Sequence, residues 1–167
     1  MSEKDCEPSE ITFSSLMLPQ DANPSGNVHG GVIMKRIDSA GGVVAQRHAR
    51  SNVVTASIDR LEFHHPVFIG NLLTLKASMN LVGNTSMEIG VRAEAEDLKT
   101  GVIRHVASAY LTFVALDGDG RPIRVPAYEP TTADAIRRHR MAINRRERRL
   151  AERQLEKDCK SDADKCQ

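Results

Sequence analysis

Residues 30–47 read GGVIMKRIDSAGGVVAQR, and this stretch decides how the rest of the chain folds. At 100° per residue its apolar and small residues fall on one stripe, while Lys35 and Ser39 fall on the opposite side. The stripe consists of Ile33, Ile37, Ala40, Gly41 and Val44. The pattern predicts a helix of about five turns. Gly41 and Gly42 each disfavour a helix by about 1 kcal/mol in an exposed interior, so we expect this helix to lie very close to another backbone.

Outside this helix the hydrophobic period is two. Apolar and polar residues alternate over residues 73–81 and 87–96, which predicts strands with one dry and one water-facing side. Residues 107–115 also alternate, but their second face is only weakly polar, so we expect this strand in the interior of the sheet. Two further strands are predicted at residues 11–18 and 53–63. An antiparallel sheet that meanders over one buried helix is an α+β fold.

The composition narrows the classes of function. A chain of 167 residues fits one core, and its net charge of +1 lacks the basic field that sequence-independent DNA binding needs. With no Trp, two Tyr and four Phe, the chain has few rings for stacking on bases. Nucleic acid is therefore not expected as a partner. Residues 131–167 carry a net charge of +4 and the remainder carries −3, so the charge is asymmetric.

Targeting and cysteine signals are weak. The chain opens on a polar, charged run, and no stretch of 18 apolar residues occurs, so we expect a soluble cytoplasmic protein without a membrane partner. Cys6, Cys159 and Cys166 lie near the termini and form neither a C-x-x-C pair nor a metal-ligand spacing, so neither a disulfide framework nor a metal site is expected.

The organisation predicted along the chain has four parts. Residues 1–10 form a disordered tail, residues 11–130 one globular domain, residues 131–158 a basic helix, and residues 159–167 a flexible end. Thr131 and Asp134 have the spacing of a capping box at the start of that helix. Its apolar stripe is thin, so it needs the body or a neighbouring subunit for stability. A solvated or subunit-docking helix is favoured over a phosphate-binding one.

Two local motifs have simple structural interpretations. Residues 117–120 read DGDG, which starts like a calcium loop, but Pro122 stands where the loop needs its glycine, so a hairpin turn is favoured. His64 and His65 are adjacent on a predicted strand end and point to opposite faces, so they are not expected to hold one metal together.

The informative segment runs from residue 21 to residue 38. Gly30 and Gly31 stand where the helix begins, so their N–H groups lack intrahelical partners and can approach a ligand carbonyl. Free N–H groups at the start of a helix can stabilise a developing oxyanion. Asp38, seven residues after Gly31, returns to nearly the same side of the helix about 10 Å further along. On these facts a catalytic carboxylate and an ordinary helix residue are equally favoured.

A series of ordered motifs runs through residues 11–130. They are Asn23-Pro24-x-Gly26, His29-Gly30-Gly31, Asp38, Val53-Val54-Thr55, Phe63-x-x-Pro66-Val67, Gly70, Gly83-Asn84-Thr85-Ser86-Met87 and Thr112-Phe113-Val114-Ala115-Leu116-Asp117. This series resembles the hotdog-fold acyl-CoA thioesterases, specifically the broad-range acyl-CoA hydrolase group. The resemblance implies an antiparallel sheet wrapped around one long helix. It also implies homodimers that pair their sheets edge to edge, and a trimer of such dimers.

The same resemblance implies the site residues of an acyl-CoA hydrolase. Asp38 would act as general base on water or as nucleophile, and Asn23 from the other subunit would orient the carbonyl or the water. The N–H of Gly31 would polarise the thioester carbonyl, and Thr55 would help to hold the water.

The same resemblance also implies which residues bind the substrate. His29 would support the loop by a hydrogen bond, and Gly30 would lie beside the substrate. The turn formed by Gly83, Asn84, Thr85 and Ser86 would lie along the pantetheine arm, although a plain hairpin turn explains it equally well. No metal or cofactor is required, since coenzyme A is part of the substrate and a product.

Three alternatives remain open. Hydratases of acyl thioesters on a similar fold use a His with a helix carboxylate, and no His beyond His29 is suitably placed here. A non-catalytic acyl-CoA sensor whose basic tail contacts nucleic acid would bind ligand without turnover. A purely structural oligomer is the third. The preferred acyl chain length does not follow from the sequence.

Overall fold

The computed structural model describes residues 10–164, with the side chains of residues 157 and 160–164 excepted. The predicted tail at residues 1–10 lies outside this range except for Glu10, which starts a strand, and residues 165–167 of the predicted end also lie outside it. The chain divides between Tyr128 and Glu129 into two compact units. Each unit is described by itself.

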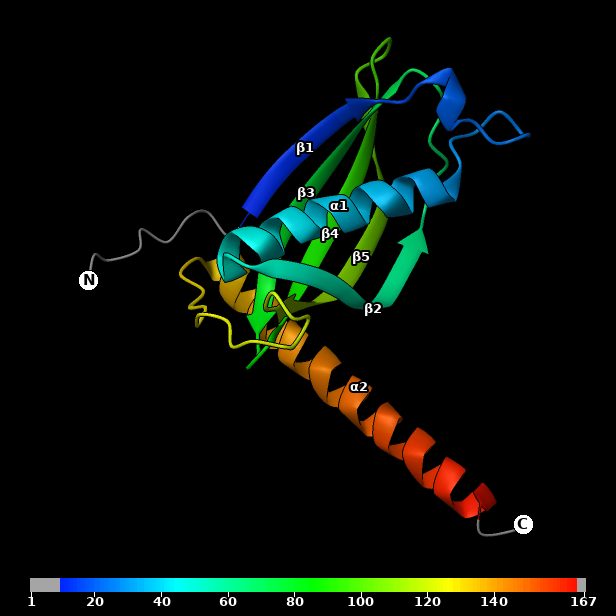
Figure 1. The fold of residues 1–167 in the computed structure, drawn as a ribbon. Helices are drawn as coiled ribbons and strands as arrows, with labels where there is room; N and C mark the ends of the chain where they lie inside the picture. Colours follow the sequence, from blue (N-terminus) through cyan, green and yellow to red (C-terminus); the bar gives the residue numbers. More distant parts are fainter. Residues whose placement is uncertain (1–9, 165–167) are drawn as a thin grey trace. The chain divides into compact units, whose positions relative to one another are not determined.

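The first unit contains one long helix and five strands (Figure 1). In chain order its elements are β1 (Glu10–Leu16), the short 3-10 helix η1 (Pro19–Asp21), α1 (Gly30–Ala49), β2 (Asn52–Phe63), β3 (Asn71–Val82), β4 (Ser86–Asp97) and β5 (Val102–Leu116). The predicted α+β fold is confirmed, and α1 lies across the sheet in Figure 1. Its 20 residues match the predicted five turns.

The sheet is antiparallel with the strand order β1-β3-β4-β5-β2. Only β3, β4 and β5 form the meander that the turn signals predict. β2 crosses to the far side of the sheet and pairs with β5, which leaves β1 and β2 as the two edges. The strand at residues 107–115 is therefore interior, as predicted from its weakly polar second face.

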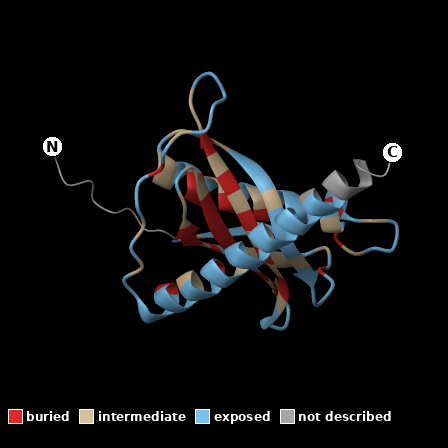
Figure 2. Ribbon diagram, turned by 90° about the horizontal axis from the view of Figure 1, so that it is seen from below, coloured by how far each residue is buried: buried red, intermediate tan, exposed pale blue. Residues whose placement is uncertain are grey.

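The core lies between α1 and one face of the sheet. The predicted stripe of α1 is buried throughout, and so are the alternating apolar residues of β3, β4 and β5. Figure 2 shows this alternation as buried bands along the strands. Fully burying a Val, Leu, Ile, Phe or Met side chain among them contributes roughly 1.5–3 kcal/mol. The 3.6-residue period of α1 and the two-residue period of the strands together predicted the core.

Two expectations about packing are corrected. A Cβ added to Gly41 would meet Phe113 Cε2 at 2.9 Å, so the close neighbour of the helix is an aromatic ring of β5 and not a backbone. Asn80 and Glu88 lie on the predicted wet face yet are buried. Asn80 Nδ2 donates to Glu88 Oε1 at 3.4 Å, and Gly90 leaves the space that the Asn80 side chain occupies.

The second unit is formed around α2 (Ala133–Asp164), which continues past residue 158, where we expected it to end. Thr132 caps it, because its Oγ1 accepts the N–H of Ala135 at 3.1 Å. The cap is therefore one residue later than the predicted box, and Asp134 lies in the first turn without closing one. Most of α2 is exposed (Figure 2). Within the described residues, no helix is long and apolar enough to span a membrane.

The DGDG segment is a turn, as expected. Asp117 Oδ1 accepts the backbone N–H groups of Asp119 and Arg121 at 2.9 and 2.8 Å, and Gly120 adopts φ +77°. In the part of the chain that the structure describes, no group of His, Cys, Asp or Glu is arranged to hold a metal ion.

Candidate active site

The loop before α1 is built around Asn23. Its side-chain Oδ1 accepts the backbone N–H groups of Ser25 at 2.9 Å and Asn27 at 3.2 Å. Gly26 completes the turn with φ +82°, a conformation that suits glycine. Because Oδ1 is used by the loop, the Nδ2 amide is the part of Asn23 that can donate to another molecule.

His29 is the N-cap of α1. Its Nδ1 accepts the N–H of Gly31 at 2.9 Å, which is the supporting hydrogen bond expected of this histidine. Gly31 therefore already has an acceptor within the chain. Among the described residues, none accepts the N–H of Gly30. The first orphan donor of the helix is thus Gly30, and Gly31 becomes available only when the His29 ring turns away.

A hollow of about 330 Å³ opens beside this helix start. Its lining combines the loop, the first turn of α1 and the segment after β2: Asn23, Asn27, Val28, Gly30, Ile33, Phe63, His64, His65, Pro66 and Val67. Gly30 faces the Phe63 ring closely, since an added Cβ would meet Phe63 Cζ at 3.7 Å. Two donors, Asn23 and Gly30, therefore border one hollow.

Two histidines of this hollow were not expected to belong to a site. The ring of His64 lies 4.7 Å from that of His105, and His65 Nδ1 donates to the backbone oxygen of His105 at 3.1 Å. His105 Nε2 lies 3.1 Å from the backbone oxygen of Ala107, which can only accept, so Nε2 carries the proton. Burial, followed by the charge of Arg92, lowers the pKa of His105 below its usual 6.5. The sequence signal was the Phe63-x-x-Pro66 spacing, which places both histidines after β2.

The carboxylate of Asp38 lies two turns further along α1. Thr55 Oγ1 on β2 donates to Asp38 Oδ1 at 2.5 Å. Asp38 is half-buried, with Gly42 and Ala45 following on its side of the helix. A register shift between Thr55 and Ser57 interrupts the pairing of β2 with β5 just after this contact. The pair thus joins the helix to an edge strand.

The turn at residues 83–86 is held by hydrogen bonds within itself, to β5 and to the segment after β5. Gly83 N–H donates to the oxygen of Ser86 at 2.7 Å, and the oxygen of Thr85 accepts the N–H of Ala115 at 3.0 Å. Asn84 binds the segment after β5 twice, through Val125 N–H at 3.0 Å and Arg124 Nε at 3.1 Å. These bonds give the turn a fixed shape.

Comparison with known proteins assigns this arrangement to a family. The model of the Thioesterase superfamily matches residues 25–102. A protein of Bacillus subtilis named uncharacterized acyl-CoA thioester hydrolase YkhA is 36% identical over 140 residues, covering 84% of this chain and 81% of that protein. The chain belongs to the thioesterase superfamily.

Solved structures of this superfamily agree with the fold. A crystal structure of an apo-hexameric acyl-CoA thioesterase matches with a TM-score of 0.84 at 37% identity, over 87% of this chain and 94% of that one. An acyl-CoA hydrolase of Staphylococcus aureus, solved with butyryl coenzyme A, matches with a TM-score of 0.82 at 35% identity, over 90% and 92%. The resemblance to hotdog-fold thioesterases is confirmed.

A longer relative also matches. The cytosolic acyl coenzyme A thioester hydrolase of Rattus norvegicus is 37% identical over 139 residues, which cover 79% of this chain but 36% of that protein. The match therefore covers about a third of the rat protein's length.

Within this thioesterase-superfamily chain the site residues form two groups. Asn23 and Gly30 border the hollow at the start of α1, while Asp38 and Thr55 are bonded to each other further along. Among the residues described, no hydrogen bond joins the two groups. The 83–86 turn is a third feature, bonded to β5 and to the segment after it.

Proposed function

We propose that this protein is an acyl-CoA thioesterase that hydrolyses acyl-CoA to a carboxylic acid and coenzyme A. The observation that carries the proposal is the hydrogen bond from Thr55 to Asp38, on the helix of a thioesterase-superfamily fold. Similar proteins named acyl-CoA thioester hydrolases support the substrate class.

The spacing of the site residues gives further support. The S. aureus hydrolase has been solved as three variants, in which one asparagine, one aspartate and one threonine are each replaced by alanine. In that protein the aspartate follows the asparagine by 15 positions and precedes the threonine by 17. Asn23, Asp38 and Thr55 have the same two spacings.

In the proposed reaction Asp38 takes a proton from water, and the water oxygen attacks the thioester carbon. The C–S bond then breaks, and the coenzyme A thiolate leaves and takes up a proton. Alternatively the carboxylate itself attacks and forms an anhydride that water opens. Asn23 Nδ2 orients the carbonyl or the water, and an N–H at the start of α1 stabilises the oxyanion. The N–H of Gly31 can be this donor if His29 Nδ1 releases it, whereas the N–H of Gly30 needs no such change.

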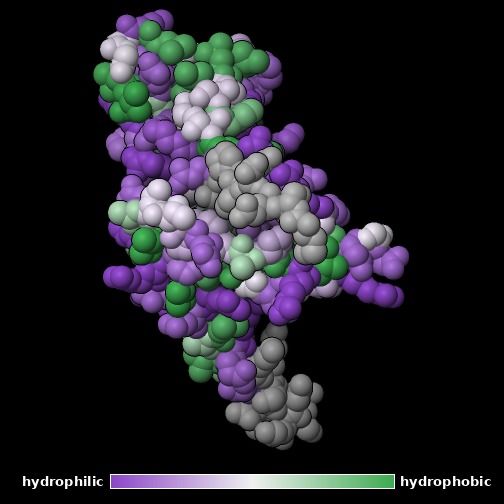
Figure 3. Space-filling model, turned by 90° about the vertical axis from the view of Figure 1, so that its left-hand side faces the viewer, coloured by the Kyte–Doolittle hydropathy of each residue, from purple (hydrophilic) through white to green (hydrophobic). Residues whose placement is uncertain are grey.

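We propose that each active site is composite, with Asn23 from one subunit and Asp38 from its partner. The separation of the two groups within one chain supports this arrangement, as does the free edge of β2, which carries exposed Val54 and Ile58. Further apolar side chains are exposed at the end of the sheet that carries the β4–β5 turn, including Leu98, Val102 and Ile103. Figure 3 shows hydrophobic side chains at its upper end on an otherwise largely hydrophilic face. A trimer of dimers would cover such surfaces, and a hexameric neighbour supports it.

The remaining assignments belong to the same proposal. The 83–86 turn lies along the pantetheine arm, with Gly83, Asn84, Thr85 and Ser86 as its lining. The reaction needs only water, and coenzyme A is a product. A cytoplasmic location is proposed because the rat relative is named cytosolic.

The first experiment follows thiol release from short, medium and long acyl-CoAs by the wild type and by Asp38→Ala and Asn23→Ala. We expect turnover by the wild type and loss of most of the rate in both variants, with the oligomer intact by light scattering. Binding without turnover would instead identify a sensor.

Mixing the two inactive variants tests the composite site. If Asn23 and Asp38 come from different subunits, each mixed dimer regains one unmodified site, and random pairing restores about a quarter of the wild-type rate. Sites contained within one chain would regain nothing. A mixture of either variant with itself is the control.

A further inference from the structure

The ring of Phe63 lies against the start of α1, in the lining of the hollow that Asn23 and Gly30 border. A Cβ built on Gly30 would meet Phe63 Cζ at 3.7 Å and Cε2 at 3.9 Å, which is ordinary van der Waals contact. Among the described residues, none accepts the N–H of Gly30. The aromatic ring and an open hydrogen-bond donor are therefore neighbours.

The sheet fixes the position of Phe63. Phe63 is the last residue of β2 and pairs with Ala107 on β5, whose side chain is buried in the core. Residues directly opposite in an antiparallel pair share a face of the sheet, so Phe63 is on the face that α1 covers. One residue later, the N–H of His64 donates to the oxygen of Val106 at 2.7 Å, and the His64 ring lies 4.7 Å from that of His105. The backbone is thus held on both sides of Phe63.

Phe63 is the accessible part of an apolar wall. Phe63 is 47% exposed, whereas three aliphatic residues of the same lining, Val28, Ile33 and Val67, are each 5% exposed or less. An exposed ring backed by buried aliphatic side chains gives a hydrocarbon a surface from which water is displaced on binding.

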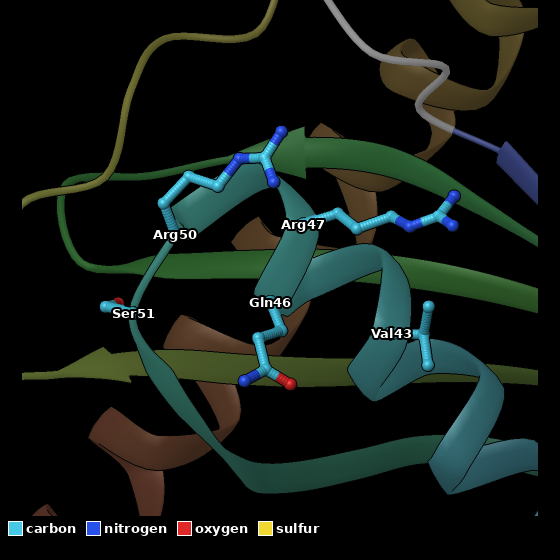
Figure 4. A pocket seen from close by; sticks show the side chains of 5 residues that line it. All are labelled: Val43, Gln46, Arg47, Arg50 and Ser51. Atoms are coloured by element: carbon cyan, nitrogen blue, oxygen red, sulfur yellow. The ribbon is translucent and has the colours of Figure 1, made fainter.

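A second hollow, at the other end of α1, has a different character. Figure 4 shows the guanidinium groups of Arg47 and Arg50 extending from the end of the helix. Val43 is the one aliphatic residue in a lining that consists of Val43, Gln46, Arg47, Arg50 and Ser51. Of these two hollows, the one at the start of α1 therefore suits a hydrocarbon.

A thioester has two arms, the acyl hydrocarbon and the sulfur of the pantetheine chain, and both leave from the carbonyl carbon. When an N–H at the start of α1 binds the carbonyl oxygen, as in the proposed function, both arms begin close to the Phe63 ring. The apolar wall suits the acyl arm, because the amide and hydroxyl groups of pantetheine would lose their hydrogen bonds to water there.

We propose that Phe63 is a specificity-determining residue, whose ring packs against the first carbons of the acyl chain and selects acyl groups that are unbranched next to the carbonyl. A methyl branch at that carbon needs space that the ring occupies, and the pairing of β2 with β5 keeps the ring from retreating. One methyl group in an apolar pocket changes discrimination between substrates by about 10–200-fold. The inference rests on the proposed function and narrows its substrate class.

The first test compares kcat/KM for butyryl-CoA and for isobutyryl-CoA, which carries the branch. We expect the wild type to prefer butyryl-CoA at least about tenfold, and Phe63→Ala to reduce this preference by about tenfold. Phe63→Leu, which keeps an apolar side chain at lower risk to folding, should give an intermediate preference. The matched control is Phe68→Ala, because Phe68 is 48% exposed but does not line the hollow. Light scattering and thermal unfolding confirm that the variants keep their oligomeric state and fold.

Calorimetry with two stable ketones repeats the comparison without turnover. In S-(2-oxopentyl)-CoA and S-(3-methyl-2-oxobutyl)-CoA a methylene group separates the sulfur from a straight or a branched acyl group, so neither is hydrolysed. We expect the wild type to bind the straight ketone more tightly and Phe63→Ala to bind the two with similar affinity. Selective binding without hydrolysis of any acyl-CoA would refute the proposed function and still support the role of Phe63.

Two results would overturn the role of Phe63. The first is the same preference for the straight acyl group in the wild type and in Phe63→Ala, or no binding of either ketone. The second is weaker binding of free coenzyme A by Phe63→Ala, which would assign the ring to the pantetheine arm. In both cases hydrolysis by the wild type would leave the proposed function standing.

Discussion

Thr55 on the edge strand β2 donates a hydrogen bond of 2.5 Å to Asp38 in the middle of α1. The bond fixes one carboxylate oxygen and leaves the other free to meet water or substrate. It also couples the orientation of the carboxylate to β2, which forms one edge of the sheet in the described residues. Any partner that pairs with β2 would therefore lie close to Asp38.

Replacing Thr55 by Val removes the hydroxyl and keeps the branched shape. We expect kcat for acyl-CoA hydrolysis to fall about tenfold with little change in KM, because a hydrogen bond to a charged group is worth roughly 1.5–3 kcal/mol. Thr55→Ser keeps the donor and should retain most of the rate. Steady-state kinetics distinguish these outcomes, and equal rates in the Val and Ser variants would remove Thr55 from the mechanism.

Replacing His29 by Ala removes the N-cap of α1. We expect a loss of about 1 kcal/mol of stability, because the N–H of Gly31 loses its acceptor. His29→Asn retains a capping oxygen and should unfold at nearly the wild-type temperature. Thermal unfolding and kcat are measured together. A fall in kcat of more than about tenfold in His29→Asn, with stability unchanged, would show that the ring acts in catalysis and not only as a cap.

The fold was predictable because burial follows local periodicity. The stripe of α1 and the alternation in β3, β4 and β5 required nothing beyond 3.6-residue and 2-residue periods. The position of β2 was not predictable in this way, since no local signal states which strand it pairs with. Nor could the pattern show that Gly41 faces the Phe113 ring, which is 72 positions away in the chain.

Part of the candidate site could also be predicted from the sequence, and part could not. The resemblance selected Asn23, Asp38 and Thr55, and the structure joins the last two by a hydrogen bond. It did not select His64, because a strand-end histidine has no distinctive pattern until the fold brings His105 beside it.

The lowered pKa of His105 predicts a stability that depends on pH. The folded state disfavours the charged ring through burial and through Arg92, whereas the unfolded ring titrates near 6.5. Below 6.5 the unfolded state therefore binds more protons, and stability falls until the pH passes the lowered folded pKa. Above 6.5 this contribution is fully present.

The check is thermal unfolding about one pH unit above and about one below 6.5. We expect the wild type to lose more stability between these two values than His105→Gln, which cannot titrate. His139→Gln on α2 controls for the loss of a histidine as such. Identical pH dependence in the wild type and His105→Gln would show that this ring keeps its ordinary pKa.

The two adjacent glycines of α1 should respond oppositely to alanine. A Cβ at Gly41 would meet Phe113 Cε2 at 2.9 Å, and the Phe113 ring is buried and cannot easily move. A Cβ at Gly42 would lie 3.7 Å from the same ring, in ordinary contact. Overpacking lowers the free energy of unfolding by about 1–3 kcal/mol, whereas replacing Gly by Ala in a helix raises it by up to about 1 kcal/mol. We therefore expect Gly41→Ala to destabilise the protein and Gly42→Ala to stabilise it.

Denaturant unfolding of the two variants measures this difference directly. Phe113→Leu in the Gly41→Ala background should recover part of the lost stability, because the smaller side chain makes room for the methyl group. If Gly41→Ala proved as stable as Gly42→Ala, α1 would have room to shift away from β5. Such a shift would also displace Asp38, three residues before Gly41, from Thr55 on β2, so in that case Gly41→Ala would lose activity while it keeps its stability.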